Sequence, residues 1–167
     1  MNAAAPQIRR LAPADAASYR DIRLEALRSN PEAFGSDFET ENAQPLTWFS
    51  DRLVSSDVFG AFREVELLGI AGFFVQKGAK AAHKGFLWGM YVRPAARKAG
   101  LGRKLAEAVI DLARQRVELI QTAVIGGNEP ARRLYAELGF VEYGLEKAAL
   151  KLGGRYYDEV LLAKVLT

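Results

Sequence analysis

The spacing of apolar residues changes several times along this chain, and each change marks the boundary of a predicted element. Between residues 14 and 29, Tyr19, Ile22 and Ala26 recur every three to four positions, which is the spacing of one helix face. Residues 117–125 instead form a nearly continuous apolar run, which suits a strand buried on both faces. The pattern therefore predicts a chain that mixes helices and strands.

The same reading of the whole chain predicts helices at 14–29, 46–54, 101–114 and 128–138, and strands at 7–11, 58–63, 67–76, 85–92, 117–125, 140–143 and 156–165. Residues 31–45 are predicted to be irregular. This order predicts an α/β (α+β) fold with a mixed central sheet of about six or seven strands and helices on both faces. The strand–helix–strand crossover over residues 85–125 predicts a locally parallel strand pair.

The composition favours a soluble, cytoplasmic protein with one domain over residues 1–167. Half of the residues are apolar, which is enough for a full core. The absence of cysteine excludes disulfides, thiolate metal sites and a thiol nucleophile. No signal-peptide core stands at the start of the sequence, and no apolar run reaches about 18 residues, so we expect no membrane span.

Positive charge is concentrated in the middle of the chain. Residues 67–106 carry eight basic and no acidic side chains, although the net charge of the whole chain is only +3. A local basic segment in a nearly neutral chain favours a small anionic ligand over a long polyanion. Nucleic-acid binding is the weaker interpretation, because no series of aromatic residues accompanies these charges.

Within this segment, Arg97-Lys98-Ala99-Gly100-Leu101-Gly102 stands between a predicted strand and a predicted helix. The first amides of a helix have no partner inside it, and two glycines leave them open to a phosphate group. The alternative is an ordinary helix start with a solvated basic rim. The glycine pattern matches neither a dinucleotide fingerprint nor a nucleoside-triphosphate loop.

A second motif, Asn128-Glu129-Pro130-Ala131-Arg132-Arg133-Leu134-Tyr135-Ala136-Glu137-Leu138-Gly139-Phe140, follows one predicted strand later. Asn128 stands where it can cap the helix or face a ligand at the helix start. Tyr135 lies two turns further on, and Gly139 is the predicted end of the helix.

The two motifs, in this order, resemble those of the GCN5-related N-acetyltransferase (GNAT) family. There, Arg/Gln-x-x-Gly-x-Gly/Ala binds the pyrophosphate of acetyl-coenzyme A (acetyl-CoA), and Asn-x-x-Ala-x-x-x-Tyr-x-x-x-Gly-Phe follows it. The resemblance implies the GNAT fold, in which the strands preceding the two motifs splay apart and form the acetyl-CoA cleft. Gly89 is placed to form a bulge that begins the splay, or simply to relieve crowding.

The resemblance also implies a set of residues that bind the co-substrate. The set comprises part of a strand, the basic turn and two residues of the second motif: Met90, Tyr91, Val92, Arg97, Lys98, Ala99, Gly100, Leu101, Gly102, Arg103, Asn128 and Tyr135. No metal site is expected.

The implied reaction is direct attack of a primary amine on the acetyl thioester in a ternary complex. Tyr135 would be the catalytic residue that protonates the departing thiolate; otherwise it is a core tyrosine on an apolar stripe. The strand at 85–92 has no acidic residue to act as base. Water relayed through backbone carbonyls, Tyr91, or a Glu of residues 31–45 remain alternatives, and His83 is a weak candidate.

Three further questions stay open from sequence. The acceptor is an amine on a small molecule or a peptide. The acidic and aromatic residues of 31–49 suit a cationic amine, or they simply form a solvated loop over packed rings. A non-catalytic acyl-CoA-binding module is the alternative function. The apolar run Val160-Leu161-Leu162-Ala163 permits a homodimer, and a central strand explains it equally well.

Overall fold

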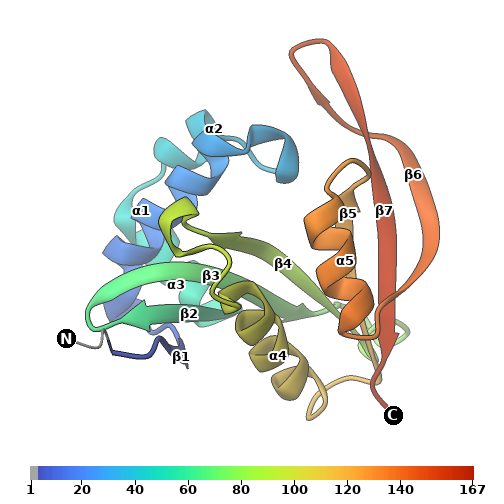
Figure 1. The fold of residues 1–167 in the computed structure, drawn as a ribbon, viewed down its shortest axis with the longest axis horizontal. Helices are drawn as coiled ribbons and strands as arrows, with labels where there is room; N and C mark the ends of the chain where they lie inside the picture. Colours follow the sequence, from blue (N-terminus) through green and yellow to red (C-terminus); the bar gives the residue numbers. More distant parts are fainter. Residues whose placement is uncertain (1–3) are drawn as a thin grey trace.

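The computed structural model describes residues 4–167 and contains one seven-stranded mixed sheet. The strands are β1 (Gln7–Arg10), β2 (Asp57–Arg63), β3 (Glu66–Val75), β4 (Lys84–Val92), β5 (Leu119–Ile125), β6 (Val141–Leu152) and β7 (Arg155–Val165). Their order across the sheet is β1-β2-β3-β4-β5-β7-β6 (Figure 1). The pair β4–β5 is parallel and every other neighbouring pair is antiparallel, so the predicted mixed sheet is confirmed.

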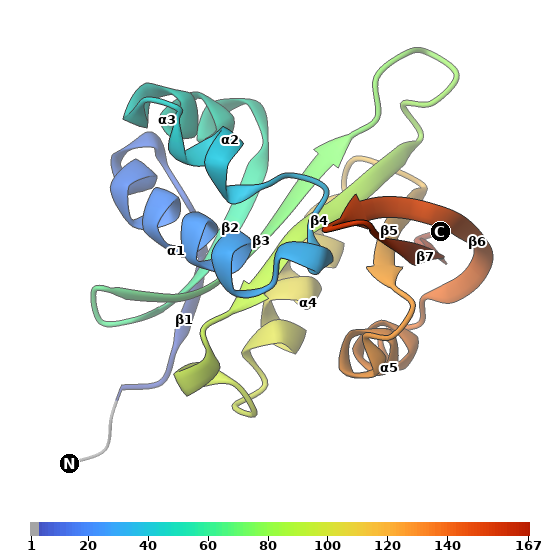
Figure 2. The ribbon, with the colours of Figure 1, turned by 90° about the horizontal axis from the view of Figure 1, so that it is seen from above.

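The α-helices are α1 (Ala16–Ser29), α2 (Phe38–Asn42), α3 (Leu46–Ser55), α4 (Leu101–Ala113) and α5 (Glu129–Glu137), and the 3-10 helices are η1 (Pro13–Asp15), η2 (Pro31–Ala33) and η3 (Pro94–Ala96). Figure 2 shows α1, α2 and α3 on one side of the sheet and α4 and α5 on the other. Each side has its own core: Tyr19, Ile22 and Phe49 pack on the first, and Leu105, Val109 and Tyr135 on the second.

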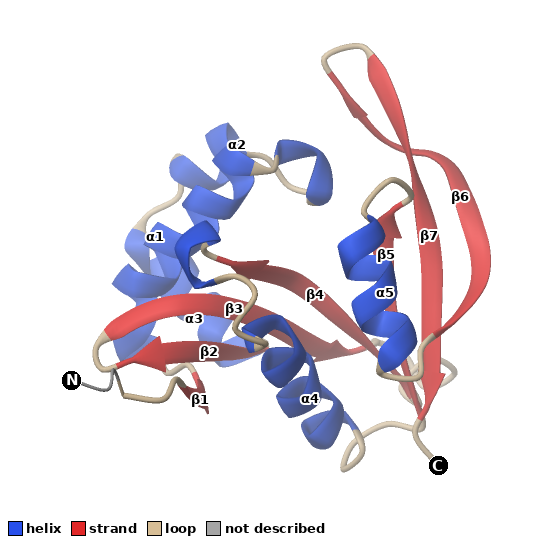
Figure 3. Ribbon diagram, viewed as in Figure 1, coloured by secondary structure: helices blue, strands red, loops and turns tan. Residues whose placement is uncertain are grey.

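Two predicted segments differ from the structure. Residues 31–45 are not irregular throughout, because η2 and α2 lie within them. Asp37 begins α2 by accepting a hydrogen bond from the Thr40 amide at 2.8 Å, a short polar cap that an apolar periodicity does not reveal. The predicted strand at 140–143 is the start of β6, which extends to Leu152. Figure 3 shows β6 as one long strand. Because β6 is exposed along most of its length, its sequence lacks the apolar run of a buried strand.

The sheet opens between β4 and β5. The two strands pair only from Lys84 to Phe86, opposite Leu119 to Gln121. At the point where they part, the Thr122 hydroxyl donates a hydrogen bond of 2.9 Å to the Leu87 carbonyl. The backbone edge of β4 beyond this point has no neighbouring strand among the described elements.

A β-bulge in β4 accompanies this divergence. Tyr91 pairs with Ile70 and Trp88 with Gly72, so one residue of β3 lies opposite two residues of β4. Gly89, one of the two, has a φ of +65°, which glycine adopts without the strain that a side chain would add. Of the two roles that the sequence left open for Gly89, the structure shows the bulge.

Within residues 4–167, no helix combines the length and the hydropathy that crossing a bilayer requires.

Candidate active site

Two adjoining cavities occupy the opening between β4 and β5. The larger, of about 910 Å³, extends toward the start of α4, and the smaller, of about 440 Å³, lies under η2 and the loop that follows it. They share six lining residues: Ala33, Phe34, Met90, Ile125, Asn128 and Ala131. The cleft therefore runs continuously from the α4 N-terminus, past the parted strands, to the α1–α2 side of the sheet.

Open backbone amides lie at the α4 end of the cleft. Gly100 caps α4 with a φ of +74°, and no atom lies within 4 Å of where its side chain would begin. Among residues 4–167, nothing accepts a hydrogen bond from the amides of Leu101, Gly102 and Arg103. These amides, with the positive end of the helix dipole, form a site suited to an anion.

The basic side chains around this turn differ in the hydrogen bonds and ion pairs that they already make within the protein. Arg97 lines the cleft and lies over the Tyr91 ring, and its Nε donates to the Val92 carbonyl at 2.9 Å. Its two terminal nitrogens have no hydrogen-bond partner within residues 4–167. Lys98 also lines the cleft and has a φ of +66°. Arg103 instead pairs with two acidic residues, at 3.0 Å to Glu107 and 3.3 Å to Glu137.

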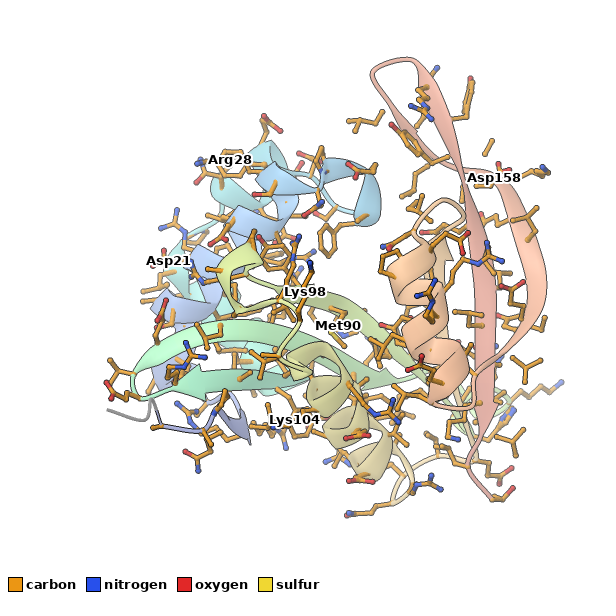
Figure 4. The ribbon with its side chains drawn as sticks, in the orientation of Figure 1. Asp21, Arg28, Met90, Lys98, Lys104 and Asp158 are labelled. Atoms are coloured by element: carbon orange, nitrogen blue, oxygen red, sulfur yellow. The ribbon has the colours of Figure 1, made fainter. Side chains whose placement is uncertain are left out.

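The remaining residues of the predicted set are placed as follows. Leu101 contributes its backbone, because its side chain is buried in the core, while Ala99 is not among the residues that line the larger cavity. Met90 and Lys98 both line that cavity (Figure 4). Lys104, which lies further along α4 in the same view, is exposed.

The contacts of the Tyr91 hydroxyl make Tyr91 a poor candidate for the general base. Its hydroxyl donates to Glu25 at 3.1 Å, and Glu25 also pairs with Arg93. Burial raises the pKa of Tyr91, and the hydrogen bond to the Glu25 carboxylate raises it further. The phenolate form that a base would need is therefore disfavoured.

Asn128 and Tyr135 present the second motif to the cleft. The Asn128 side chain caps α5 by accepting a hydrogen bond from the Ala131 amide at 3.3 Å, and the residue also lines both cavities. Tyr135 is 4% exposed, packs edge-on against Phe140 and lines the smaller cavity. Burial raises the pKa of Tyr135 well above its ordinary value, although the Thr122 hydroxyl beside it acts in the opposite direction. The phenol thus stays protonated and can donate.

The acidic residues of 31–45 have different surroundings: Asp37 caps α2, Glu32 lines the larger cavity, and Glu41 is held in a buried network. Glu41 is 1% exposed and accepts hydrogen bonds from Arg23 at 2.9 and 3.0 Å and from Arg52 at 3.3 Å. This buried network joins α1, α2 and α3 behind the cleft. His83 is exposed on the loop before β4.

Comparison with known proteins identifies the family. The model of the acetyltransferase (GNAT) family matches residues 19–140, which span both motifs and the parted strands. This chain belongs to the GNAT family. The resemblance inferred from the two motifs is therefore confirmed.

Individual GNAT proteins resemble the chain along nearly its whole length. A GNAT acetyltransferase from Streptococcus pneumoniae has a TM-score of 0.86 at 21% identity, covering 98% of this chain and 100% of that one. YncA from Salmonella typhimurium, solved with its cofactor acetyl-CoA, has a TM-score of 0.82 at 24% identity, covering 98% and 95%. YwnH of Bacillus subtilis, provisionally named a phosphinothricin acetyltransferase, is 24% identical, over 90% of this chain and 97% of its own.

Among the residues of the GNAT cleft that the sequence analysis missed is one carboxylate. Glu159 of β7 lines the smaller cavity and is only partly exposed. A signal was present: Glu159 directly precedes the apolar run Val160-Leu161-Leu162, where a carboxylate is unusual. It could not be interpreted without knowing that β7 lies next to β5.

Proposed function

We propose that this GNAT protein transfers an acetyl group from acetyl-CoA to a primary amine by direct attack. The observation that carries the proposal is the continuous cleft between β4 and β5. At one end it has unpaired helix amides, and further in it has the hydroxyl of a buried tyrosine. These are the two chemical functions that a bound pyrophosphate and a departing thiolate require.

The residues of the cleft fit acetyl-CoA in two places. The amides of Leu101, Gly102 and Arg103, with the terminal nitrogens of Arg97, suit the pyrophosphate. The edge of β4 at Met90–Val92 has no neighbouring strand on this side and suits the amides of the pantetheine arm, although the Val92 carbonyl already accepts from Arg97. Asn128 lines the same cavity. Arg103, already paired with Glu107 and Glu137, would act mainly through its backbone.

Bound acetyl-CoA supplies the acetyl group as an activated thioester. A backbone amide at Met90 or Tyr91 would stabilise the negative charge that develops on the thioester oxygen. Tyr135 would give its proton to the sulfur, since its raised pKa keeps the phenol protonated at neutral pH.

A small-molecule amine is the acceptor that the cavity favours. The smaller cavity, of about 440 Å³, is covered by residues 33–36 and walled by aromatic side chains such as Phe34, Phe86 and Trp88. This volume lies in the range of small-ligand sites. The provisional name of YwnH, which refers to a small amine-bearing molecule, points the same way.

The test is release of free thiol from acetyl-CoA in the presence of a panel of acceptors, comprising alkylamines, aralkylamines such as phenethylamine, amino acids and short peptides. We expect release with at least one small primary amine, with the acetylated amine confirmed by mass spectrometry. Acetyl-CoA binding by calorimetry without turnover on any acceptor would instead favour a non-catalytic acyl-CoA-binding module.

We also propose that two copies of the chain pair through β6. This strand is at the edge of the sheet, and its hairpin with β7 projects beyond the rest of the molecule (Figure 1). Val141, Tyr143 and Leu145 are 68%, 55% and 50% exposed. An unpaired edge strand with exposed apolar residues is suited to cover by another chain.

A further inference from the structure

Glu159 is a carboxylate on the wall of the smaller cavity. In the antiparallel pair β5–β7 it lies directly opposite Ile125, which also lines the cavity. Within residues 4–167 its side chain makes no hydrogen bond and no ion pair. Unlike Glu41, which Arg23 and Arg52 hold, Glu159 therefore keeps its oxygens for a ligand.

The register of the sheet places Glu159 and Tyr135 on opposite faces of the sheet, next to the opening between β4 and β5. Val160 and its partner Val124 are buried in the core that contains Tyr135. Because side chains alternate along a strand, Glu159 and Ile125 face the other side, where η2 approaches β5. A group held in the opening would thus meet the phenol from one side and the carboxylate from the other.

The surroundings of Glu159 make it a better proton acceptor than an ordinary glutamate. Burial raises its pKa, and the charge of Glu146, its cross-strand partner on β6, raises it further. Ile125, opposite it on β5, carries no charge, and the other titratable groups that line the cavity are Arg23 from α1 and Tyr135 from α5. Arg23 is already bound to Glu41, so it does not neutralise Glu159.

We propose that Glu159 binds the ammonium group of the acceptor and removes its proton. This inference rests on the proposed acetyl transfer and names the missing base. One N–H bond of the ammonium breaks, its proton moves to the Glu159 carboxylate, and the nitrogen regains its lone pair. The nitrogen then bonds to the acyl carbon as the C–S bond breaks, and Tyr135 protonates the sulfur. The second amine proton returns through water to Tyr135, and the proton on Glu159 passes to solvent. The products are the amide, coenzyme A and one proton.

The assignment of Glu159 as the base predicts which acceptors bind in the smaller cavity. A cationic primary amine with an apolar or aromatic body fits a cavity that has one carboxylate and aromatic walls at Phe34, Phe86 and Trp88. An acceptor whose amine is already uncharged at neutral pH needs no base, so its reaction depends much less on Glu159.

The experiment compares the wild type with Glu159→Gln, using the fastest primary amine of the acceptor panel and phenylhydrazine, which is largely uncharged at neutral pH. We expect kcat/KM for the charged amine to fall about 100-fold at neutral pH, the range for loss of a general base. The fall for phenylhydrazine should be much smaller. The acidic limb of the wild-type pH profile should disappear in the variant, while acetyl-CoA affinity by calorimetry and the unfolding temperature stay unchanged.

Glu146→Gln is the matched control, because it makes the same change on the neighbouring strand. It should keep the activity at neutral pH and move the acidic limb to lower pH, since it removes a charge that raises the pKa of Glu159. If Glu159→Gln keeps wild-type kcat and the same acidic limb, or only raises KM, the assignment of the base is wrong. A wild type that acetylates no amine would overturn the proposed function itself.

Discussion

Arg97 illustrates how the role of one side chain depends on what else holds it. Its Nε is fixed by the Val92 carbonyl and its plane lies over Tyr91, so the terminal nitrogens are oriented before any ligand arrives. Arg103, six residues after Arg97, is instead bound to Glu107 and Glu137. The motif alone predicts both as phosphate ligands. The pair with Glu107, four residues on, could be seen in the sequence, but the pair with Glu137, 34 positions away, could not.

We predict that Arg97→Glu weakens acetyl-CoA binding at least tenfold. The change removes a charge-assisted contact, valued at about 1.5–3 kcal/mol, and adds repulsion toward the pyrophosphate. Isothermal calorimetry measures the dissociation constant. Lys104→Glu, the same reversal at an exposed position further along α4, should have a smaller effect, and equal losses in both variants would indicate a general field effect rather than a contact.

Tyr135→Phe should lower kcat about 100-fold or more and leave the affinity for acetyl-CoA nearly unchanged. The ring and its edge-on contact with Phe140 are kept, and only the proton donor is lost. Steady-state kinetics and calorimetry on the same preparation separate the two effects. Turnover at the wild-type level would show that the buried tyrosine serves the core alone.

At the scale of elements, the opening of the sheet depends on two local features. The bulge at Gly89 interrupts the pairing of β4 with β3, which resumes at Tyr91. The Thr122 hydroxyl donates to the Leu87 carbonyl where β5 leaves β4. The glycine was recognisable from sequence, because a glycine within an apolar strand suggests a bulge. The threonine was not, because its partner is 35 positions away.

We predict that Thr122→Val destabilises the protein by about 1–3 kcal/mol. The substitution keeps the shape of the side chain but leaves the buried Leu87 carbonyl without a donor. Urea unfolding followed by circular dichroism measures the free energy of unfolding. Thr122→Ser keeps the hydroxyl and should recover most of the loss; a serine variant as unstable as the valine one would contradict this account.

A network of Arg23, Glu41 and Arg52 joins the first three α-helices. Because Glu41 can be protonated, this network makes the free energy of unfolding depend on pH. Burial by itself would raise the pKa of Glu41, but the hydrogen bonds from Arg23 and the charges of both arginines outweigh it, so the pKa is lowered. A carboxyl group with a depressed native pKa stabilises the fold above its unfolded pKa. That contribution is lost as the pH falls through the native value.

Glu41→Gln should therefore cost about 3–5 kcal/mol at neutral pH, because it leaves two arginines without their buried partner. Below the ordinary glutamate pKa of 4.5, the difference in the free energy of unfolding between variant and wild type should shrink, because the native carboxyl becomes protonated. Urea unfolding at neutral and acidic pH measures both. Glu39→Gln, an exposed change on the same helix, should leave the pH dependence as in the wild type.

Over the whole molecule, most of the fold followed from apolar spacing, because the buried faces of α1, α4 and β5 impose a strong pattern. The cleft required the two motifs, whose residues are far apart in sequence but meet where the sheet opens. What stayed hidden depends on long-range neighbours: the partner of Thr122, the burial of Glu41 and the position of Glu159 beside β5.

Assembly is the property that concerns the molecule as a whole. We predict a homodimer in sedimentation velocity at micromolar concentration, paired through the unprotected edge of β6. Tyr143→Lys and Val141→Lys together should shift the protein toward monomer, because charged residues on an edge strand oppose pairing with another chain. Both residues lie outside the lining of the cleft, so thiol release should persist in the monomer. A wild type that sediments as a monomer over the whole concentration range would exclude this interface, and a dimer unaffected by the substitutions would place it elsewhere.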